Sequence, residues 1–265
     1  MPSDERTRFS KAEGYERYLG PWSSALAPRF IDFACVQDGD RVLDVGSGTG
    51  ALTLALAASK SCPEIIGIDP SAPFIEFAWT RTSDPRVRFQ VSDATDLPFE
   101  DDYFDKSLAQ LVLNSISDAR LAAVEMRRVT KPGDIVAACV WASGAKNERE
   151  QVFWGAAMAI DPAAGERREV EGRFSKTGRL SSLWTECGLK EIEETELTVS
   201  ANFASFEDFW LPYLEGQGHG GSYVKGLSRD LQETLRERVR QNIPGKRAKV
   251  PFSLRAQAVA VRGIC

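Results

Sequence analysis

The stretch VLDVGSGTG, residues 42–50, decides the fold of this 265-residue chain. A short strand pattern leads into a turn with glycine at positions 46, 48 and 50, and the helix-forming run ALTLALAAS follows at 51–59. Glycine is needed where a chain turns tightly and its backbone comes close to a ligand. The stretch therefore predicts the strand–turn–helix unit that opens many nucleotide-binding α/β domains.

Strand and helix patterns alternate outward from this turn. Strands are predicted at 41–45, 64–69, 87–93, 104–113, 134–141, 189–199 and 252–263. Helices are predicted at 51–59, from residue 70 onward, and at 119–130, 151–160 and 177–187, with further helices between the last two strands. Such alternation is typical of a parallel sheet covered by helices on both faces. We predict an α/β fold with a Rossmann-like, doubly wound, seven-stranded sheet and helical lid insertions.

One domain with three segments accounts for this pattern. Residues 1–40 are expected to form an N-terminal helical cap, and residues 41–142 the ligand-binding core. Residues 143–265 are expected to supply the remaining strands together with helical elements that form a lid and contact a substrate.

Composition excludes several other classes of protein. The net charge of −5 argues against a nucleic-acid partner, because phosphate backbones are bound by basic surfaces. No apolar run is long enough for a membrane helix, and the polar N-terminus contains no secretory signal. One histidine and five scattered cysteines without a C-x-x-C pair predict neither a metal site nor a disulfide framework. We expect a cytoplasmic protein; the sequence indicates no oligomeric state.

Three acids end three successive predicted strands. Asp44 precedes the first glycine by two residues, Asp69 ends the next strand, and Asp93 ends the third. Ligands of open α/β sheets bind at the carboxyl ends of the strands, so a shared crevice is expected there. A carboxylate at Asp44 disfavours a pyrophosphate and suits an ammonium group. Asp69 can accept both hydroxyls of a ribose, which fits NAD and S-adenosylmethionine equally.

The order and spacing of these motifs resemble class I S-adenosylmethionine-dependent methyltransferases of the ubiquinone/menaquinone-biosynthesis-like group (methyltransferase type 11). The motifs that carry the resemblance are VLDVGSGTG, IIGIDPS, VSDATDLPFEDDYFD, SLAQLVLNSISD and EMRRVTKPGDIVAACVW. It covers roughly residues 40–141, and it implies that the last strand is antiparallel. The family often has histidines where this chain has Asn114 and Ser115.

The resemblance also implies a set of cofactor-binding residues. Gly46, Ser47 and Gly48 would lie against the methionine part, with Asp44 near its ammonium group. The remaining residues implied are Asp69 and Pro70 at the ribose, Asp93 and Ala94 at the adenine, Gln110 near the sulfonium, and Tyr18 from a helix that closes over the cofactor.

The lid segments offer one candidate base and an aromatic set. His219, the only histidine, lies in the glycine-rich run GQGHGGS, where a turn is predicted. It is a candidate general base for a hydroxyl or amine acceptor, or else an exposed loop residue. Aromatic residues at 203–213 would line an apolar acceptor pocket or form the buried face of a lid helix.

Together these observations predict a methyltransferase that moves a methyl group from S-adenosylmethionine to a small-molecule acceptor by in-line displacement, leaving S-adenosylhomocysteine. Two alternatives stay open. The glycine turn also satisfies the G-x-G-x-x-G/A pattern of an NAD(P)-dependent oxidoreductase. A non-catalytic module that binds S-adenosylmethionine is the other.

Overall fold

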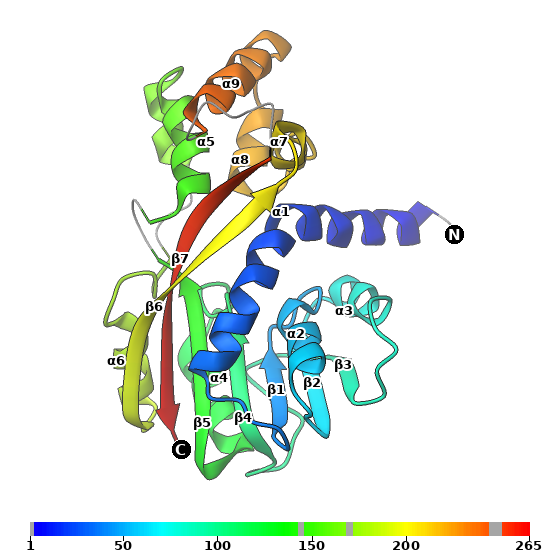
Figure 1. Ribbon diagram of the computed structural model, residues 1–265, viewed down its shortest axis with the longest axis vertical. Coiled ribbons are helices and arrows are strands. Elements are labelled where there is room, and N and C mark those ends of the chain that lie inside the picture. Colours follow the sequence, from blue (N-terminus) through cyan, green and yellow to red (C-terminus); the bar gives the residue numbers. More distant parts are fainter. Residues whose placement is uncertain (1–2, 143–145, 168–171, 244–250) are drawn as a thin grey trace.

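Seven strands form one sheet in the computed structural model, in the order β3-β2-β1-β4-β5-β7-β6 (Figure 1). The strands are β1 (Arg41–Val45), β2 (Glu64–Asp69), β3 (Val87–Val91), β4 (Phe104–Gln110), β5 (Thr130–Trp141), β6 (Lys190–Phe203) and β7 (Phe252–Ile264). The structure describes residues 3–142, 146–167, 172–243 and 251–265. Strand β7 runs antiparallel to β5 and β6, and the pairs among β1 to β5 are parallel. The predicted fold, including its antiparallel last strand, is confirmed.

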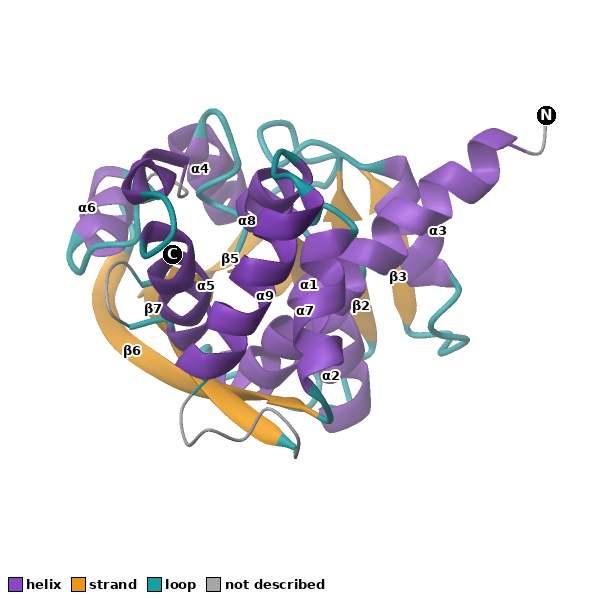
Figure 2. Ribbon diagram, turned by 90° about the horizontal axis from the view of Figure 1, so that it is seen from above, coloured by secondary structure: helices purple, strands orange, loops and turns teal. Residues whose placement is uncertain are grey.

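Helices lie on both faces of this sheet (Figure 2). They are α1 (Ser3–Phe33), α2 (Ala51–Ser59), α3 (Ala72–Trp79), α4 (Ala119–Val129), α5 (Glu148–Met158), α6 (Arg179–Glu186), α7 (Phe206–Leu214), α8 (Gly218–Lys225) and α9 (Arg229–Asn242), with a 3₁₀ turn at Pro162–Arg167. Figure 1 shows that the N-terminal half of α1 crosses the end of the sheet where β1 and β2 terminate. The C-terminal half of α1 then runs along one face of the sheet. Pro21 and Pro28 lie inside α1, and proline removes a backbone hydrogen bond that would keep a helix straight.

Helices α5, α7, α8 and α9 form the lid, which lies at one end of the two longest strands, β6 and β7. Figure 1 shows β6 and β7 extending past the other strands, with α5, α7, α8 and α9 gathered at that end. Aromatic rings fill the space between these helices: Phe153 stacks on Tyr213 with ring centroids 4.4 Å apart, and Phe206 stacks on Trp210 at 6.1 Å. All four side chains are buried. Most of the aromatic residues expected in a lid therefore pack against one another.

Several elements differ from the sequence prediction, and three of the differences have a clear local reason. Strand β4 ends at Gln110 rather than at residue 113, because Leu111 adopts a left-handed backbone with φ of 65°. Strand β6 continues to Phe203, since it keeps pairing with β7. The glycine-rich run forms helix α8 instead of a turn: a Cβ at Gly220 would lie 2.7 Å from the Tyr213 ring. Glycine there permits close helix packing.

Candidate active site

The glycine turn after β1 has the backbone that the sequence predicted. Gly46, Gly48 and Gly50 have φ values of 72°, 54° and 91°, in the left-handed region that side chains disfavour. A Cβ at Gly46 would also lie 2.3 Å from Val112 Cγ2. The turn is joined to β2, because the Ser47 N–H donates to the Ile68 carbonyl at 2.8 Å. These constraints explain the glycines and bring the turn against the strand that ends in Asp69.

A small cavity lies between this turn and α1. Its walls are Tyr15, Ser23, Asp44, Gly46, Ser47, Gly48, Thr49, Ala51, Leu52, Gln110 and Leu111. Five predicted cofactor residues are therefore neighbours around one space. Its open volume of about 30 Å³ is far below the roughly 300–1,000 Å³ of a small-molecule site. Tyr15 and Ser23 belong to α1, so this helix closes the crevice.

Asp44 is buried near the end of β1, and only one of its two carboxylate oxygens is hydrogen-bonded among the described residues. Oδ2 accepts hydrogen bonds from the Thr53 backbone at 3.0 Å and the Thr53 hydroxyl at 2.6 Å. Oδ1 is buried and has no hydrogen-bond partner among the described residues. Burial raises the pKa of Asp44 to about 7, against the opposing hydrogen bonds from Thr53. Leaving a buried acceptor unpaired is costly, which indicates a group that binds a donor.

Two further buried oxygens in the same cavity lack partners within the described part of the chain. They are the Ser47 Oγ and the Gln110 Oε1. The Gln110 amide is held in place because its Nε2 donates to the Ser23 carbonyl of α1 at 3.1 Å. Together with Asp44 Oδ1, three buried oxygens in the walls of this cavity have no hydrogen-bond partner among the described residues. An ammonium group offers three donors and a compensating charge, so the methionine part of S-adenosylmethionine fits these residues.

Asp69 lies at the rim of the turn, at the end of β2. Its Oδ2 accepts from the Gly48 N–H at 3.0 Å and its Oδ1 from the Ser71 N–H at 2.9 Å. Burial raises its pKa, and these two backbone hydrogen bonds lower it. Each carboxylate oxygen can accept a second hydrogen bond. The side chain is thus fixed with free lone pairs, the arrangement that binding two ribose hydroxyls requires.

The residues predicted at the adenine lie farther out. Asp93 is exposed, and its Oδ1 accepts from the Thr95 N–H at 2.8 Å and the Thr95 hydroxyl at 2.7 Å. These hydrogen bonds lower its pKa. Ala94 is buried and Pro70 is exposed. None of the three lines the closed cavity as the structure describes it, although β2 and β3 pair in parallel register and bring Asp69 and Asp93 to the same edge.

Tyr15, rather than the predicted Tyr18, lines the crevice. Tyr15 also packs on Phe74, with ring centroids 5.0 Å apart. Burial, followed by the negative charge of Asp69, raises the pKa of Tyr15. Tyr18 instead turns to the lid, where its ring lies edge to face with Tyr213 at 5.6 Å and beneath Arg149. Tyr18 therefore does not line the described cavity, and its role at the cofactor stays a prediction.

His219 and Asn114 occupy different surroundings. His219 lies in the first turn of α8 and is exposed, rather than on a loop, and it is not among the residues around the crevice. Asn114, where relatives often have histidine, accepts from the Phe174 N–H at 3.1 Å and donates to Ser175 Oγ at 3.3 Å. Asn114 thus ties the segment before α6 to the loop after β4.

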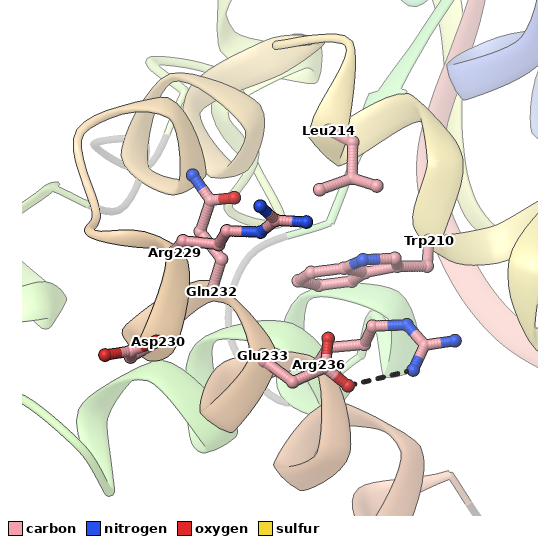
Figure 3. A pocket seen from close by; sticks show the side chains of 7 residues that line it. All are labelled: Trp210, Leu214, Arg229, Asp230, Gln232, Glu233 and Arg236. Atoms are coloured by element: carbon pink, nitrogen blue, oxygen red, sulfur yellow. Dashed lines mark hydrogen bonds and ion pairs between the residues drawn. The ribbon is translucent and has the colours of Figure 1, made fainter.

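A larger hollow of about 410 Å³ lies on the lid between α7 and α9 (Figure 3). Its walls are Trp210, Leu214, Arg229, Asp230, Gln232, Glu233 and Arg236. Of these residues only Trp210 belongs to the aromatic set that was predicted to line an acceptor pocket or to be buried in the lid, and Figure 3 shows the Arg236 guanidinium already paired with Glu233. Its size therefore does not make it the better candidate.

Metal ligands, thiols and apolar helices also bear on the kind of site this is. The described residues contain no group of three or more histidine, cysteine, aspartate or glutamate side chains that would hold a metal ion. All five cysteines are free thiols. No helix within the described ranges has the length and apolarity needed to span a bilayer.

Comparison with known proteins finds relatives of the segment that contains the glycine turn. Residues 43–138 match the family described as "Methyltransferase domain". A demethylmenaquinone methyltransferase of Clavibacter sepedonicus is 39% identical over 102 residues, which are 38% of this chain and 41% of the relative. The chain thus aligns with less than half the length of this curated relative.

Solved structures resemble the whole chain but at low identity. A phosphoethanolamine N-methyltransferase of Haemonchus contortus, in complex with phosphomonomethylethanolamine and S-adenosylhomocysteine, has a TM-score of 0.58 and 17% identity, covering 97% of this chain and 57% of its own. The [4+2]-cyclase SpnF has a TM-score of 0.56 and 20% identity, covering 91% and 81%. These likenesses concern the fold alone. Residues 43–138 are thus similar to a methyltransferase domain, and the sheet of the whole chain has the class I methyltransferase fold.

Proposed function

We propose that this protein transfers a methyl group from S-adenosylmethionine to a small-molecule acceptor. The observation that carries the proposal is that three buried oxygens in the walls of one cavity, on Asp44, Ser47 and Gln110, have no hydrogen-bond partner among the described residues. A cationic amino acid joined to a nucleoside satisfies these groups. A pyrophosphate would meet the buried carboxylate of Asp44 beside the glycine turn, which disfavours NAD(P).

The residues around the crevice would hold the cofactor in separate parts. Asp44 would pair with the ammonium group, Gln110 would lie near the sulfonium, and Asp69 would accept from the ribose. Asp93 and Ala94 would bind the adenine at the open edge. When bound, S-adenosylmethionine supplies a methyl group on a sulfonium, which is already activated for in-line displacement. Helix α1 would exclude water from the reacting centre through Tyr15 and Ser23.

Proton transfer is required only for some acceptors. A nucleophile that is neutral and unprotonated needs positioning alone. A hydroxyl acceptor needs a base within hydrogen-bonding distance. His219 is the residue proposed for that role; because it is exposed on α8, it would have to approach the crevice by movement of the lid.

Calorimetric titration with S-adenosylhomocysteine tests the proposal. The wild-type protein is expected to bind it, and Asp69→Ala and Gly48→Val are expected to lose binding. Gly39→Val is the matched control, because Gly39 also has a positive φ, of 95°, with no atom near its Cβ, and lies outside the crevice. Unchanged affinity in both site variants, or binding of NADH without competition by S-adenosylmethionine, contradicts the assignment.

Turnover separates an enzyme from a binding module. The fold does not decide between them, because a structural neighbour with this fold is described as a cyclase. Formation of S-adenosylhomocysteine with any member of an acceptor panel supports the methyltransferase. Tight binding with no product across a panel of phenols, quinols, amines and thiols favours the non-catalytic alternative.

A further inference from the structure

Arg149 is a buried cation whose hydrogen-bonding capacity is largely unused. It lies in the first turn of α5 and is 7% exposed. Its Nη2 pairs with Glu150 at 2.9 Å, whereas Nε and Nη1 are buried without hydrogen-bond partners in the described ranges. The guanidinium is always charged and carries five donors. Burying such donors unpaired is expensive unless a ligand completes them.

Aromatic side chains from α1 enclose the guanidinium. Its central carbon lies 4.5 Å from the ring centre of Tyr18 and 6.0 Å from that of Trp22, one helical turn apart on the same face of α1. The indole N–H of Trp22 is also buried and lacks a partner among described residues. Three buried nitrogen donors on two residues, Arg149 Nε and Nη1 and Trp22 Nε1, thus lack a hydrogen-bond partner within the part of the chain that the structure describes.

This donor cluster, Trp22 and Arg149, is adjacent to the cofactor crevice. Ser23, which lines the crevice and accepts from Gln110, directly follows Trp22 in α1. The charge of Arg149 also acts on Tyr15, where it lowers the pKa that burial and Asp69 raise. Helix α5 follows β5, the strand next to β4, which ends in Gln110. Arg149 thus lies on the side of the crevice that faces the lid.

We propose that Arg149, with Trp22, binds an anionic group, a carboxylate or a phosphate, on the methyl acceptor. The proposal rests on the proposed function and specifies the acceptor class. A guanidinium fork matches both groups in a bidentate manner, and desolvation strengthens the pair. Tyr18 and Tyr213 would contact the apolar part of the acceptor. Because Tyr18 and Trp22 belong to α1, movement of this helix opens the donor cluster and the crevice together.

Small anions test the proposal without knowledge of the acceptor. Benzoate, phenyl phosphate and the neutral isostere benzamide are titrated into protein saturated with S-adenosylhomocysteine, and binding is followed by ligand-observed NMR. Wild-type protein is expected to bind one of the anions at least about tenfold more tightly than benzamide. Preference for benzoate identifies a carboxylate acceptor, and preference for phenyl phosphate a phosphorylated one. Equal or absent binding of all three probes overturns the proposal.

Variants assign the preference to Arg149. Arg149→Met is expected to abolish it, and Arg149→Lys, which keeps the charge but not the fork, to retain part of it. Arg240→Met is the matched control, because Arg240 lies 4.5 Å over the Phe206 ring, away from the crevice. An anion preference that survives in Arg149→Met overturns the proposal, as does its loss in the control.

Cofactor binding distinguishes failure of this inference from failure of the proposed function. S-adenosylhomocysteine affinity is expected to stay within about threefold of wild type in Arg149→Met, because Arg149 does not line the crevice. A wild-type protein that does not bind S-adenosylhomocysteine contradicts the proposed function. A protein that binds it normally but shows no anion preference contradicts only the role of Arg149. If Arg149→Met does not fold, the probe titrations of the wild-type protein and of Arg149→Lys still test whether Arg149 binds the anion.

Discussion

Unpaired polar atoms of opposite kind define the two ends of the candidate site. The crevice holds buried acceptors on Asp44, Ser47 and Gln110, and the region toward the lid holds buried donors on Trp22 and Arg149. Native proteins pair most of their buried polar groups, so such clusters need an explanation. A cationic cofactor end and an anionic acceptor end would pair both clusters.

Asp44 is expected to make cofactor binding depend on pH. Since burial raises its pKa to about 7, acidification below that value protonates the carboxylate and removes its attraction for an ammonium group. The wild-type affinity for S-adenosylhomocysteine should fall by up to about tenfold per pH unit between pH 7 and pH 5. Asp44→Asn should bind more weakly at pH 8 and show little of this slope in calorimetry. A slope equal to that of the wild type assigns the effect to another group.

The same carboxylate is expected to lower the stability of the ligand-free protein at neutral pH. Its folded pKa of about 7 exceeds the ordinary 3.8, so the folded state binds more protons between these values. Stability from this group is therefore complete below about pH 4 and is lost as pH rises to about 7, by ~1.4 kcal/mol per unit at most. Urea unfolding should show Asp44→Asn gaining on the wild type over this window.

Asp84→Asn is the control for the pH dependence of urea unfolding. Hydrogen bonding from Arg86 lowers the pKa of Asp84, so its stabilisation is lost as pH falls, the opposite direction. A stability difference between Asp44→Asn and wild type that does not vary with pH would show that the carboxylate is not desolvated.

The sequence predicted five of the crevice residues but not Arg149. Asp44 and Asp69 were predictable because an acid at a strand end beside a glycine turn has few other reasons to be there. Arg149 stands in the run NERE, which has the composition of a solvated helix start. Its burial depends on contacts with α1, more than a hundred residues earlier, and no local pattern encodes such contacts. The only local signal was a helix predicted nearby, at 151–160.

At the scale of elements, α1 is longer than the sequence pattern alone explains. A helical cap was predicted over residues 1–40, and one helix extends from Ser3 to Phe33 although Pro21 and Pro28 lie inside it. Tertiary contacts explain its persistence, because α1 packs on α2, α3, β4, β6 and α7. Glu16 accepts from the Thr49 hydroxyl at 2.6 Å and pairs with Arg81 at 3.0 Å. These contacts fasten α1 to the glycine turn.

Removing the contacts of Glu16 with Thr49 and Arg81 is expected to speed binding of the cofactor. A crevice with about 30 Å³ of open space cannot admit a nucleoside until α1 moves, so the apparent affinity is the intrinsic affinity multiplied by the fraction of protein that is open. Glu16→Ala should raise the association rate constant of S-adenosylhomocysteine by roughly two- to tenfold, since the partly buried pair contributes about 1 kcal/mol. Stopped-flow tryptophan fluorescence measures it. Glu13→Ala, an exposed change in the same helix, serves as control, and equal rates in both variants contradict the gating role.

At the scale of the molecule, lid and sheet share one hydrophobic core. The cluster on the α1 side of the sheet continues from Val42 in β1 through Trp22 to Phe153 and Trp210 in the lid. A second cluster, with Phe104 and Trp184, fills the other face. Because both clusters pack on the same strands, the three segments predicted from the sequence should behave as a single domain.

Cooperative unfolding tests that continuity. Phe153, 1% exposed and stacked on Tyr213, joins α5 to α7, so Phe153→Ala leaves a cavity and should lower the free energy of unfolding by about 3–5 kcal/mol. Urea unfolding followed by circular dichroism and by tryptophan fluorescence should still give one coincident transition, because the lid has no core separate from that of the sheet. Leu211→Ala, at a lid position that is 46% exposed, should change stability by less than about 1 kcal/mol. Two separate transitions in Phe153→Ala would mean that the lid unfolds alone, and the acceptor end of the site would then be an independent unit rather than an extension of the cofactor domain.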